Sequence, residues 1–68
     1  MFRYLVVEYY YEDESAYGKK NVLGSYKTPG EARKAAGIYI TENVKTKRMK
    51  YRDWYVRVLK DRIYFDIR

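Results

Sequence analysis

The sequence predicts a single α+β domain, residues 1–68, in the order ββαββ. One helix packs on one face of a four-stranded, mainly antiparallel sheet. Three observations lead to this fold class: an unbroken aromatic and β-branched run at 2–11, a helix-capping motif at 28–31, and apolar–polar alternation over 53–60 and 62–68. One helix covers only one face of such a sheet, so the other face is expected to be open to solvent or to a partner.

The first strand is predicted at 2–11, and the charge of Glu8 sets which residues face water. Side chains alternate between the two faces of a strand. The expected solvent face therefore holds Tyr4, Val6, Glu8 and Tyr10, and the expected core face holds Leu5, Val7 and Tyr9.

A polar loop is predicted at 12–21, followed by a short second strand at 22–26. Gly24 within that strand indicates a bulge or a close backbone contact. Thr28 is then a helix N-cap, with Pro29 at the first helical position and Glu31 at the third. The helix is expected to end near residue 44. Its inward face is formed by Ala32, Ala35, Ala36, Tyr39, Ile40 and Asn43.

Two further strands are predicted after the helix, joined by a tight turn near Lys60 and Asp61. The residues expected to pack under the helix are Trp54, Val56, Val58, Ile63, Phe65 and Ile67. The residues expected on the outward face are Tyr55, Arg57, Tyr64, Asp66 and Arg68, together with Tyr4 and Tyr10 of the first strand.

The composition argues against catalysis. The 68 residues include no histidine and no cysteine, which removes the usual general base, the thiol nucleophile and most transition-metal ligands. Three acidic residues at 12–14 are compatible with a hard cation or an acid–base pair, but a solvated loop explains them more simply. We therefore expect no catalytic residue, no metal site and no cofactor, and the protein is not expected to be an enzyme.

The formal net charge is +6, and it is concentrated in the second half of the chain. Residues 1–34 carry six basic and five acidic side chains, whereas residues 35–68 carry nine and four. No apolar run is long enough to span a bilayer, and the first residues do not resemble a signal peptide. A cytoplasmic protein without a membrane partner is expected.

The segment 45–52, KTKRMKYR, contains five basic side chains and no acid. Such a cluster neutralises phosphates, and arginines interleaved with tyrosines on an open sheet face provide a surface on which bases stack. The favoured hypothesis is a small basic protein that binds DNA or RNA through backbone contacts and tyrosine stacking. The candidate binding residues are Lys45, Lys47, Arg48, Lys50, Tyr51, Arg52, Tyr55, Arg57, Tyr64 and Arg68.

The basic residues and the tyrosines also have purely structural explanations. Basic residues are favourable at any helix C-terminus, and tyrosine is a common residue of half-exposed strands. Tyrosine and arginine are also enriched in protein interfaces. The competing hypothesis is therefore a protein-binding regulator or inhibitor, of the kind that phages and mobile elements encode, acting on an acidic protein surface. An exposed edge strand would also permit a homodimer.

The stretch LGSYKTPGEARKAA, residues 23–36, resembles the strand-to-helix corner of AP2-like and integrase arm-type DNA-binding domains. The matching elements are Leu23-Gly24, Tyr26, Thr28, Glu31-Ala32, Ala35 and Ala36. The resemblance implies a sheet that packs on a helix and lies in the DNA major groove. The corner is also similar to that of septal glycan-binding SPOR domains. This chain departs from the DNA-binding pattern because its first two strands carry Glu8 and an acidic loop where a groove reader needs arginines.

Overall fold

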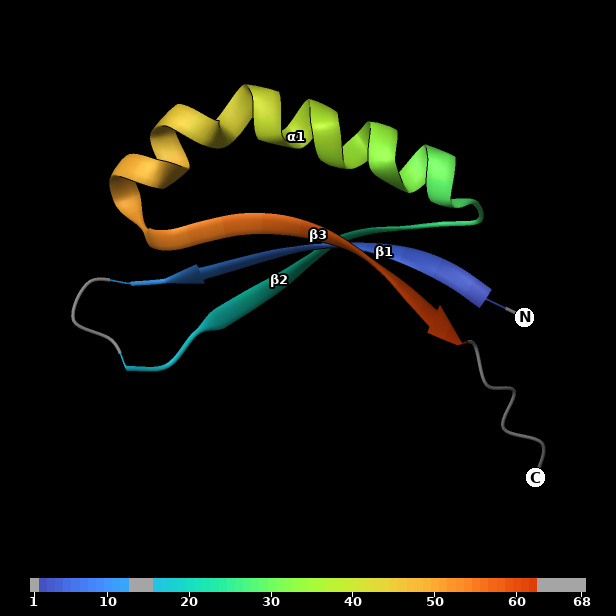
Figure 1. Ribbon diagram of the computed structural model, residues 1–68, viewed down its shortest axis with the longest axis horizontal. Helices are drawn as coiled ribbons and strands as arrows, with labels where there is room; N and C mark the ends of the chain where they lie inside the picture. The colour runs from blue at the N-terminus through green and yellow to red at the C-terminus, as the bar shows by residue number, and fades with distance from the viewer. Residues whose placement is uncertain (1, 13–15, 63–68) are drawn as a thin grey trace.

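The computed structural model describes residues 2–12 and 16–62, which form three strands and one helix. The elements are β1 (Phe2–Tyr11), β2 (Lys19–Tyr26), α1 (Pro29–Lys50) and β3 (Arg52–Arg62). The strands form one antiparallel sheet in the order β2-β1-β3, and α1 lies across one face of it (Figure 1). The predicted arrangement of one helix on a sheet is confirmed, but the predicted four-stranded sheet is wrong.

The fourth strand fails because β3 continues through the position of the predicted turn. Lys60 pairs with Tyr4 and Asp61 pairs with Arg3, so both residues lie inside the strand. The Asp61 carboxylate also accepts a hydrogen bond from the Arg3 guanidinium at 3.1 Å. Pairing with the whole length of β1 outweighs a two-residue turn that has no glycine or asparagine to favour it. The predicted residues Ile63, Tyr64, Phe65, Asp66, Ile67 and Arg68 lie outside the described part of the chain.

The predicted orientation of β1 is also wrong. Val6 packs against Ala32 and Ala36 of the helix, and Tyr4 joins this cluster. Glu8, two residues further on, is only 1% exposed. The even-numbered residues from Tyr4 to Tyr10 therefore face α1, and Leu5, Val7 and Tyr9 face the other way.

Helix α1 begins as predicted but ends later. The Thr28 hydroxyl accepts a hydrogen bond from the backbone N–H of Glu31 at 3.2 Å, and Pro29 occupies the first turn. The helix continues to Lys50 instead of ending near residue 44, because its last turns consist mostly of good helix formers. Three basic residues in the last turn also interact favourably with the helix dipole. Tyr51 caps the helix by donating its N–H to the carbonyl of Lys47 at 2.8 Å.

The core is small, as the length of the chain requires. Val6, Ala32 and Ala36 are buried between helix and sheet, and the alanines allow the helix to lie close to the sheet. Val7 is also buried, at 2% exposure, although it lies on the face of β1 that points away from α1. Trp54 is 7% exposed. Partly buried residues surround the core cluster: Tyr4, Tyr26, Ala35, Val56 and Val58. The predicted inward positions of Ala32, Ala35 and Ala36 in α1 and of Trp54, Val56 and Val58 in β3 are confirmed.

Bulges interrupt both pairs of strands. In β2, Gly24 pairs with Val6 but Val22 pairs with Val7, which leaves Leu23 as an extra residue. Of the two alternatives predicted at Gly24, a bulge or a close backbone contact, the structure has a bulge directly beside it, at Leu23, and β2 begins at Lys19, three residues earlier than expected. The ring of Tyr26 covers Gly24, where a Cβ atom would lie 2.9 Å from the tyrosine hydroxyl.

The bulge in β3 separates residues that a regular strand would keep on one face. Tyr9 pairs with Tyr55 but Tyr11 pairs with Arg52, so Asp53 and Trp54 together lie opposite a single residue of β1. Asp53 has a φ of 52°, a left-handed conformation that aspartate tolerates better than most residues. The extra residue lets Trp54 point toward α1 while Arg52 lies on the opposite face of the sheet.

Candidate functional site

The face of the sheet opposite α1 is the open face. Strand pairing places on it Arg3, Leu5, Val7, Tyr9 and Tyr11 of β1, Lys20, Val22 and Ser25 of β2, and Arg52, Tyr55, Arg57, Leu59 and Asp61 of β3. No helix or strand within residues 2–12 and 16–62 covers this face, because α1 lies on the other side (Figure 1).

Three tyrosines lie together at one end of the open face. The rings of Tyr9 and Tyr55 are stacked, with 5.0 Å between their centroids and 17° between their planes. Tyr55 is 46% exposed, so part of this stack is accessible to solvent. The guanidinium of Arg52 lies 5.3 Å from the ring centroid of Tyr11, a cation–π contact at the end of the same strand pair.

A hollow of about 260 Å³ opens beside the stacked rings. It is lined by Tyr9, Tyr10, Tyr11, Gly18, Lys19, Lys20 and Tyr55. A side chain at Gly18 would contact the ring of Tyr11, with 3.2 Å between a Cβ atom and the nearest ring carbon. The hollow is smaller than a typical pocket for a drug-sized ligand, so it suits a single planar group held between aromatic walls and amino groups.

The charge of the open face near the tyrosines is positive. Lys20 and Arg57 form no salt bridge with any residue of the described ranges, and Arg52 lies beside Tyr11. The carboxylate of the open face, Asp61, lies at the opposite end of the strands and is paired with Arg3 at 3.1 Å.

Lys19, at the rim of the hollow, differs from its neighbour Lys20. Its Nζ lies 3.0 Å from a carboxylate oxygen of Glu12. The hydrogen bond and the charge of Glu12 raise the pKa of Lys19. This lysine therefore remains protonated, but its charge is already balanced.

The other face of the sheet contains a buried carboxylate. Glu8 accepts hydrogen bonds from Trp54 Nε1 and Tyr39 Oη, each at 2.8 Å, and from Asn21 Nδ2 at 3.3 Å. Lys47 Nζ lies 3.6 Å away. We call Glu8, these three donors and Lys47 the Glu8 cluster. It links β1, β2, α1 and β3.

The electrostatics of the Glu8 cluster favour an ionised carboxylate. Burial alone raises the pKa of Glu8, but the three hydrogen bonds and the charge of Lys47 outweigh burial and leave the pKa below its ordinary value. Burial raises the pKa of Tyr39, and its hydrogen bond to Glu8 raises it further. For Lys47, burial acts to lower the pKa, but the negative charge of Glu8 reverses the direction and raises it. Because Glu8 is 1% exposed, its carboxylate is shielded from solvent by the groups that surround it.

The structure divides the predicted binding residues between two faces. Lys45, Lys47, Arg48 and Lys50 lie on α1, and Tyr51 follows at its cap. Arg52, Tyr55 and Arg57 lie on the open face. Tyr64 and Arg68 lie outside the described residues. The basic segment therefore does not form one continuous surface.

Several predicted residues are engaged with other parts of the protein. Lys47 belongs to the Glu8 cluster, and its Nζ also lies 5.4 Å from the ring centroid of Tyr51. The Nζ of Lys50 lies 5.2 Å from the centroid of the same ring. Tyr10, predicted to face outward, packs against Tyr51 on the helix side with 4.2 Å between ring centroids. Tyr4, also predicted outward, packs against the core.

The sequence prediction missed Tyr9, Tyr11 and Lys20 of the open face. The run of three tyrosines at 9–11 was the available signal, because such a run places at least one ring on each face whichever way the strand is turned. Lys20 falls within the predicted loop 12–21, but the structure places it in β2.

Comparisons with known proteins identify no relative. No protein-family model matches the chain, no curated protein is significantly similar to it, and no solved structure matches it significantly. Within the described ranges, no three histidine, cysteine, aspartate or glutamate residues are grouped to hold a metal ion. The helix found in those ranges is not long and apolar enough to cross a membrane.

Proposed function

We propose that the protein binds single-stranded nucleic acid on the open face, in a binding and not a catalytic role. The observation that carries this proposal is the stacked pair Tyr9 and Tyr55, which is partly exposed at the edge of a hollow with cationic side chains around it. Aromatic rings on a sheet surface are the usual platform on which proteins stack unpaired bases.

The cations of the open face supply the second requirement, contact with the backbone. Arg57 follows Tyr55 by two residues on the same face, and Lys20 pairs with Tyr9 on the other side of β1. The tyrosine stack is therefore flanked by positive charge on both sides. A strand whose bases stack on the rings would have its phosphates within reach of these side chains.

The open face favours single strands over duplex DNA. Stacking requires bases that are not paired with each other, and the face offers rings at its accessible surface. Reading a duplex in the major groove would instead use arginine or asparagine side chains that make paired hydrogen bonds to base edges. Of the open-face arginines, Arg3 is paired with Asp61 and Arg52 lies over the ring of Tyr11. The resemblance of residues 23–36 to AP2-like domains implies that duplex mode, so duplex DNA is the necessary comparison.

The test measures fluorescence anisotropy of labelled (dT)20, (rU)20 and a 20-base-pair duplex at two salt concentrations. We expect the single strands to bind more tightly than the duplex, with affinity falling steeply as salt rises. Tyr55→Ala should weaken binding by about 1–3 kcal/mol, about 5- to 150-fold, while Tyr55→Phe retains the stacking surface and most of the affinity. Arg57→Gln should reduce the salt slope by about one unit.

The matched control is Phe2→Ala. Phe2 is an aromatic residue with 49% exposure, close to the 46% of Tyr55, but it lies at the far end of β1. We expect this variant to bind as the unchanged protein does. Equal losses in both variants would contradict a specific role for the tyrosine stack.

A protein partner is the alternative occupant of the same face, since tyrosine and arginine also form interface hot spots. The measurement separates the two hypotheses. The protein hypothesis predicts no salt-dependent binding to any of the three oligonucleotides. It also predicts saturable binding to one acidic protein, which Tyr55→Ala abolishes. These two results together would replace the nucleic-acid proposal with the protein one.

A further inference from the structure

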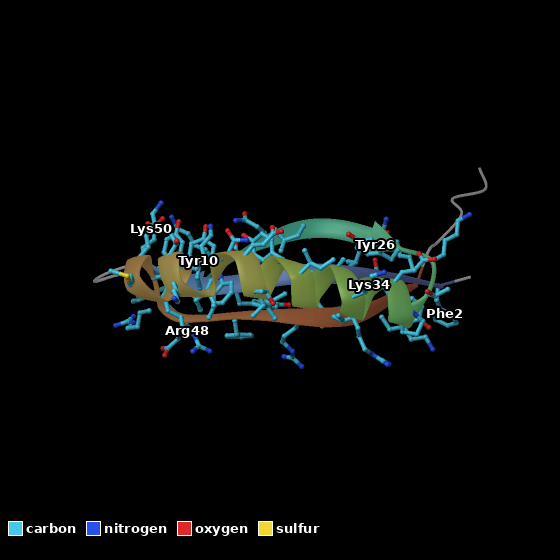
Figure 2. All side chains as sticks on the ribbon, turned by 90° about the horizontal axis from the view of Figure 1, so that it is seen from above. Phe2, Tyr10, Tyr26, Lys34, Arg48 and Lys50 are labelled. Carbon is cyan, nitrogen blue, oxygen red and sulfur yellow. The ribbon has the colours of Figure 1, made fainter. Side chains whose placement is uncertain are left out.

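The solvent-facing side of α1 forms a second cationic surface, on the opposite side of the molecule from the open face. Exposed residues at helical spacing run along it: Lys34, Ile38, Thr41, Lys45 and Arg48. We call this the helix stripe. Figure 2 looks down on this side of the helix and labels two residues of the stripe, Lys34 and Arg48, the second of which lies toward β3. Lys50, which is not part of the stripe, lies on the other side of the helix, toward β2.

The helix stripe has the length and charge to follow a phosphate backbone. Lys34 and Arg48 are separated by about 20 Å along the axis, at 1.5 Å per residue, which spans several phosphates. The exposed carboxylates of the helix, Glu31 and Glu42, lie along one edge of the stripe, three residues before Lys34 and Lys45, and Glu42 lines one wall of the depression described below. Neither is paired with Lys34, Lys45 or Arg48 among the salt bridges of the described residues.

The surface of the stripe also allows close approach. Apart from its chain neighbours and the backbone of its own helix, Gly37 has no atom within 4 Å of the position that a Cβ atom would occupy. It contributes to a shallow depression of about 400 Å³ lined by Arg33, Lys34, Gly37, Ile38, Thr41 and Glu42. No aromatic residue lines this depression, so it suits a backbone and not a stacked base.

We infer that the protein binds two nucleic-acid strands at once, the first by base stacking on the open face and the second by its phosphates on the helix stripe. This inference rests on the proposed function of the open face. The two surfaces lie on opposite sides of a single two-layer domain, so both strands fit on one chain without a clash. One chain would then bridge two strands.

The test is a capture assay with the 68-residue chain. Biotinylated (dT)20 is held on beads, and a fluorescent (dT)20, which cannot pair with it, is added with and without protein. We expect the protein to retain the fluorescent strand in a salt-sensitive manner. Native mass spectrometry should show complexes of one chain with two strands.

Matched variants separate the stripe from a general effect of charge. Lys45→Gln with Arg48→Gln removes two charges from the helix stripe. Lys27→Gln with Lys60→Gln removes two charges from positions outside both surfaces. We expect the first pair to bind immobilised (dT)20 within about twofold of the unchanged protein and to lose capture of the second strand at least fivefold. The double variant Lys27→Gln with Lys60→Gln should retain both binding of immobilised (dT)20 and capture of the second strand.

The possible failures are distinguishable. Binding of the first strand without capture of the second overturns the bridge and leaves the proposed function intact. No binding of the immobilised strand overturns both. Equal loss of capture in the two double variants, or complexes that always contain two chains and two strands, also overturns the bridge, because charge alone or a dimer would then account for it.

Discussion

At the scale of single residues, Glu8 connects more of the fold than any other described side chain. Its carboxylate accepts hydrogen bonds from residues of β2, α1 and β3. One of these donors, Trp54, is 46 residues away in sequence. A buried carboxylate is costly unless its oxygens are well hydrogen-bonded, and here three donors and a nearby ammonium satisfy it. Removing the carboxylate would therefore leave the buried indole N–H of Trp54 and the partly buried hydroxyl of Tyr39 without this acceptor.

We predict that Glu8→Gln destabilises the fold by about 1–3 kcal/mol near pH 7, because the amide keeps one acceptor but loses the charge and presents a donor to other donors. The folded-state pKa of Glu8 lies below its ordinary value of 4.5, so its stabilising contribution is complete above that value and is lost as the pH falls through the lowered pKa. The difference in the free energy of unfolding between the unchanged protein and Glu8→Gln should therefore become smaller as the pH falls. Urea denaturation from pH 3 to pH 7 measures it.

The exposed residue Glu42 provides the control for this prediction, since Glu42→Gln removes the same charge from the surface of α1. Its effect on the free energy of unfolding should stay within about 0.5 kcal/mol at every pH. A constant difference between Glu8→Gln and the unchanged protein down to pH 3 would contradict the role given to the ionised carboxylate.

At the scale of secondary-structure elements, two glycines respond to the same substitution with opposite signs. Gly37 lies within α1 with open space beside it, so alanine adds helix propensity without a clash and should stabilise by about 0.5–1 kcal/mol. Gly24 lies under the ring of Tyr26, so alanine must displace a partly buried side chain and should destabilise by about 1–2 kcal/mol. Chemical denaturation of the two variants measures both. Destabilisation by Gly37→Ala would contradict the open space observed there.

Helix α1 was predicted better than strands β1 and β3, because its start depends on neighbouring residues, whereas the orientation of β1 and the length of β3 depend on distant ones. The start of α1 depends on Thr28 and Pro29, which act on their immediate neighbours, and it was predicted correctly. The orientation of β1 depends on distant donors that make burial of Glu8 favourable, and no local rule contains them. The continuation of β3 through Lys60 depends likewise on the length of its partner strand. In the candidate site, Tyr55 and Arg57 were therefore placed on the correct face, while Tyr4 and Tyr10 were not.

At the scale of the whole molecule, one thin core supports the four described elements, and this makes separate unfolding of its parts unfavourable. Strand β1 lies at the centre of the sheet, and the helix covers it through Val6, Ala32 and Ala36. The Glu8 cluster adds a second point at which all four elements meet. Loss of any one strand would expose both regions together.

We therefore predict a single two-state unfolding transition. Trp54 is the sole tryptophan of the chain, is 7% exposed, and donates its indole N–H to Glu8, so its fluorescence reports on the junction of β1 with β3. Far-ultraviolet circular dichroism reports mainly on α1. The urea midpoints from the two probes should coincide, and in Glu8→Gln they should shift together to lower urea. Loss of the helical signal at a lower urea concentration than the tryptophan signal would show that α1 detaches from an intact sheet, which would contradict a core shared by both layers.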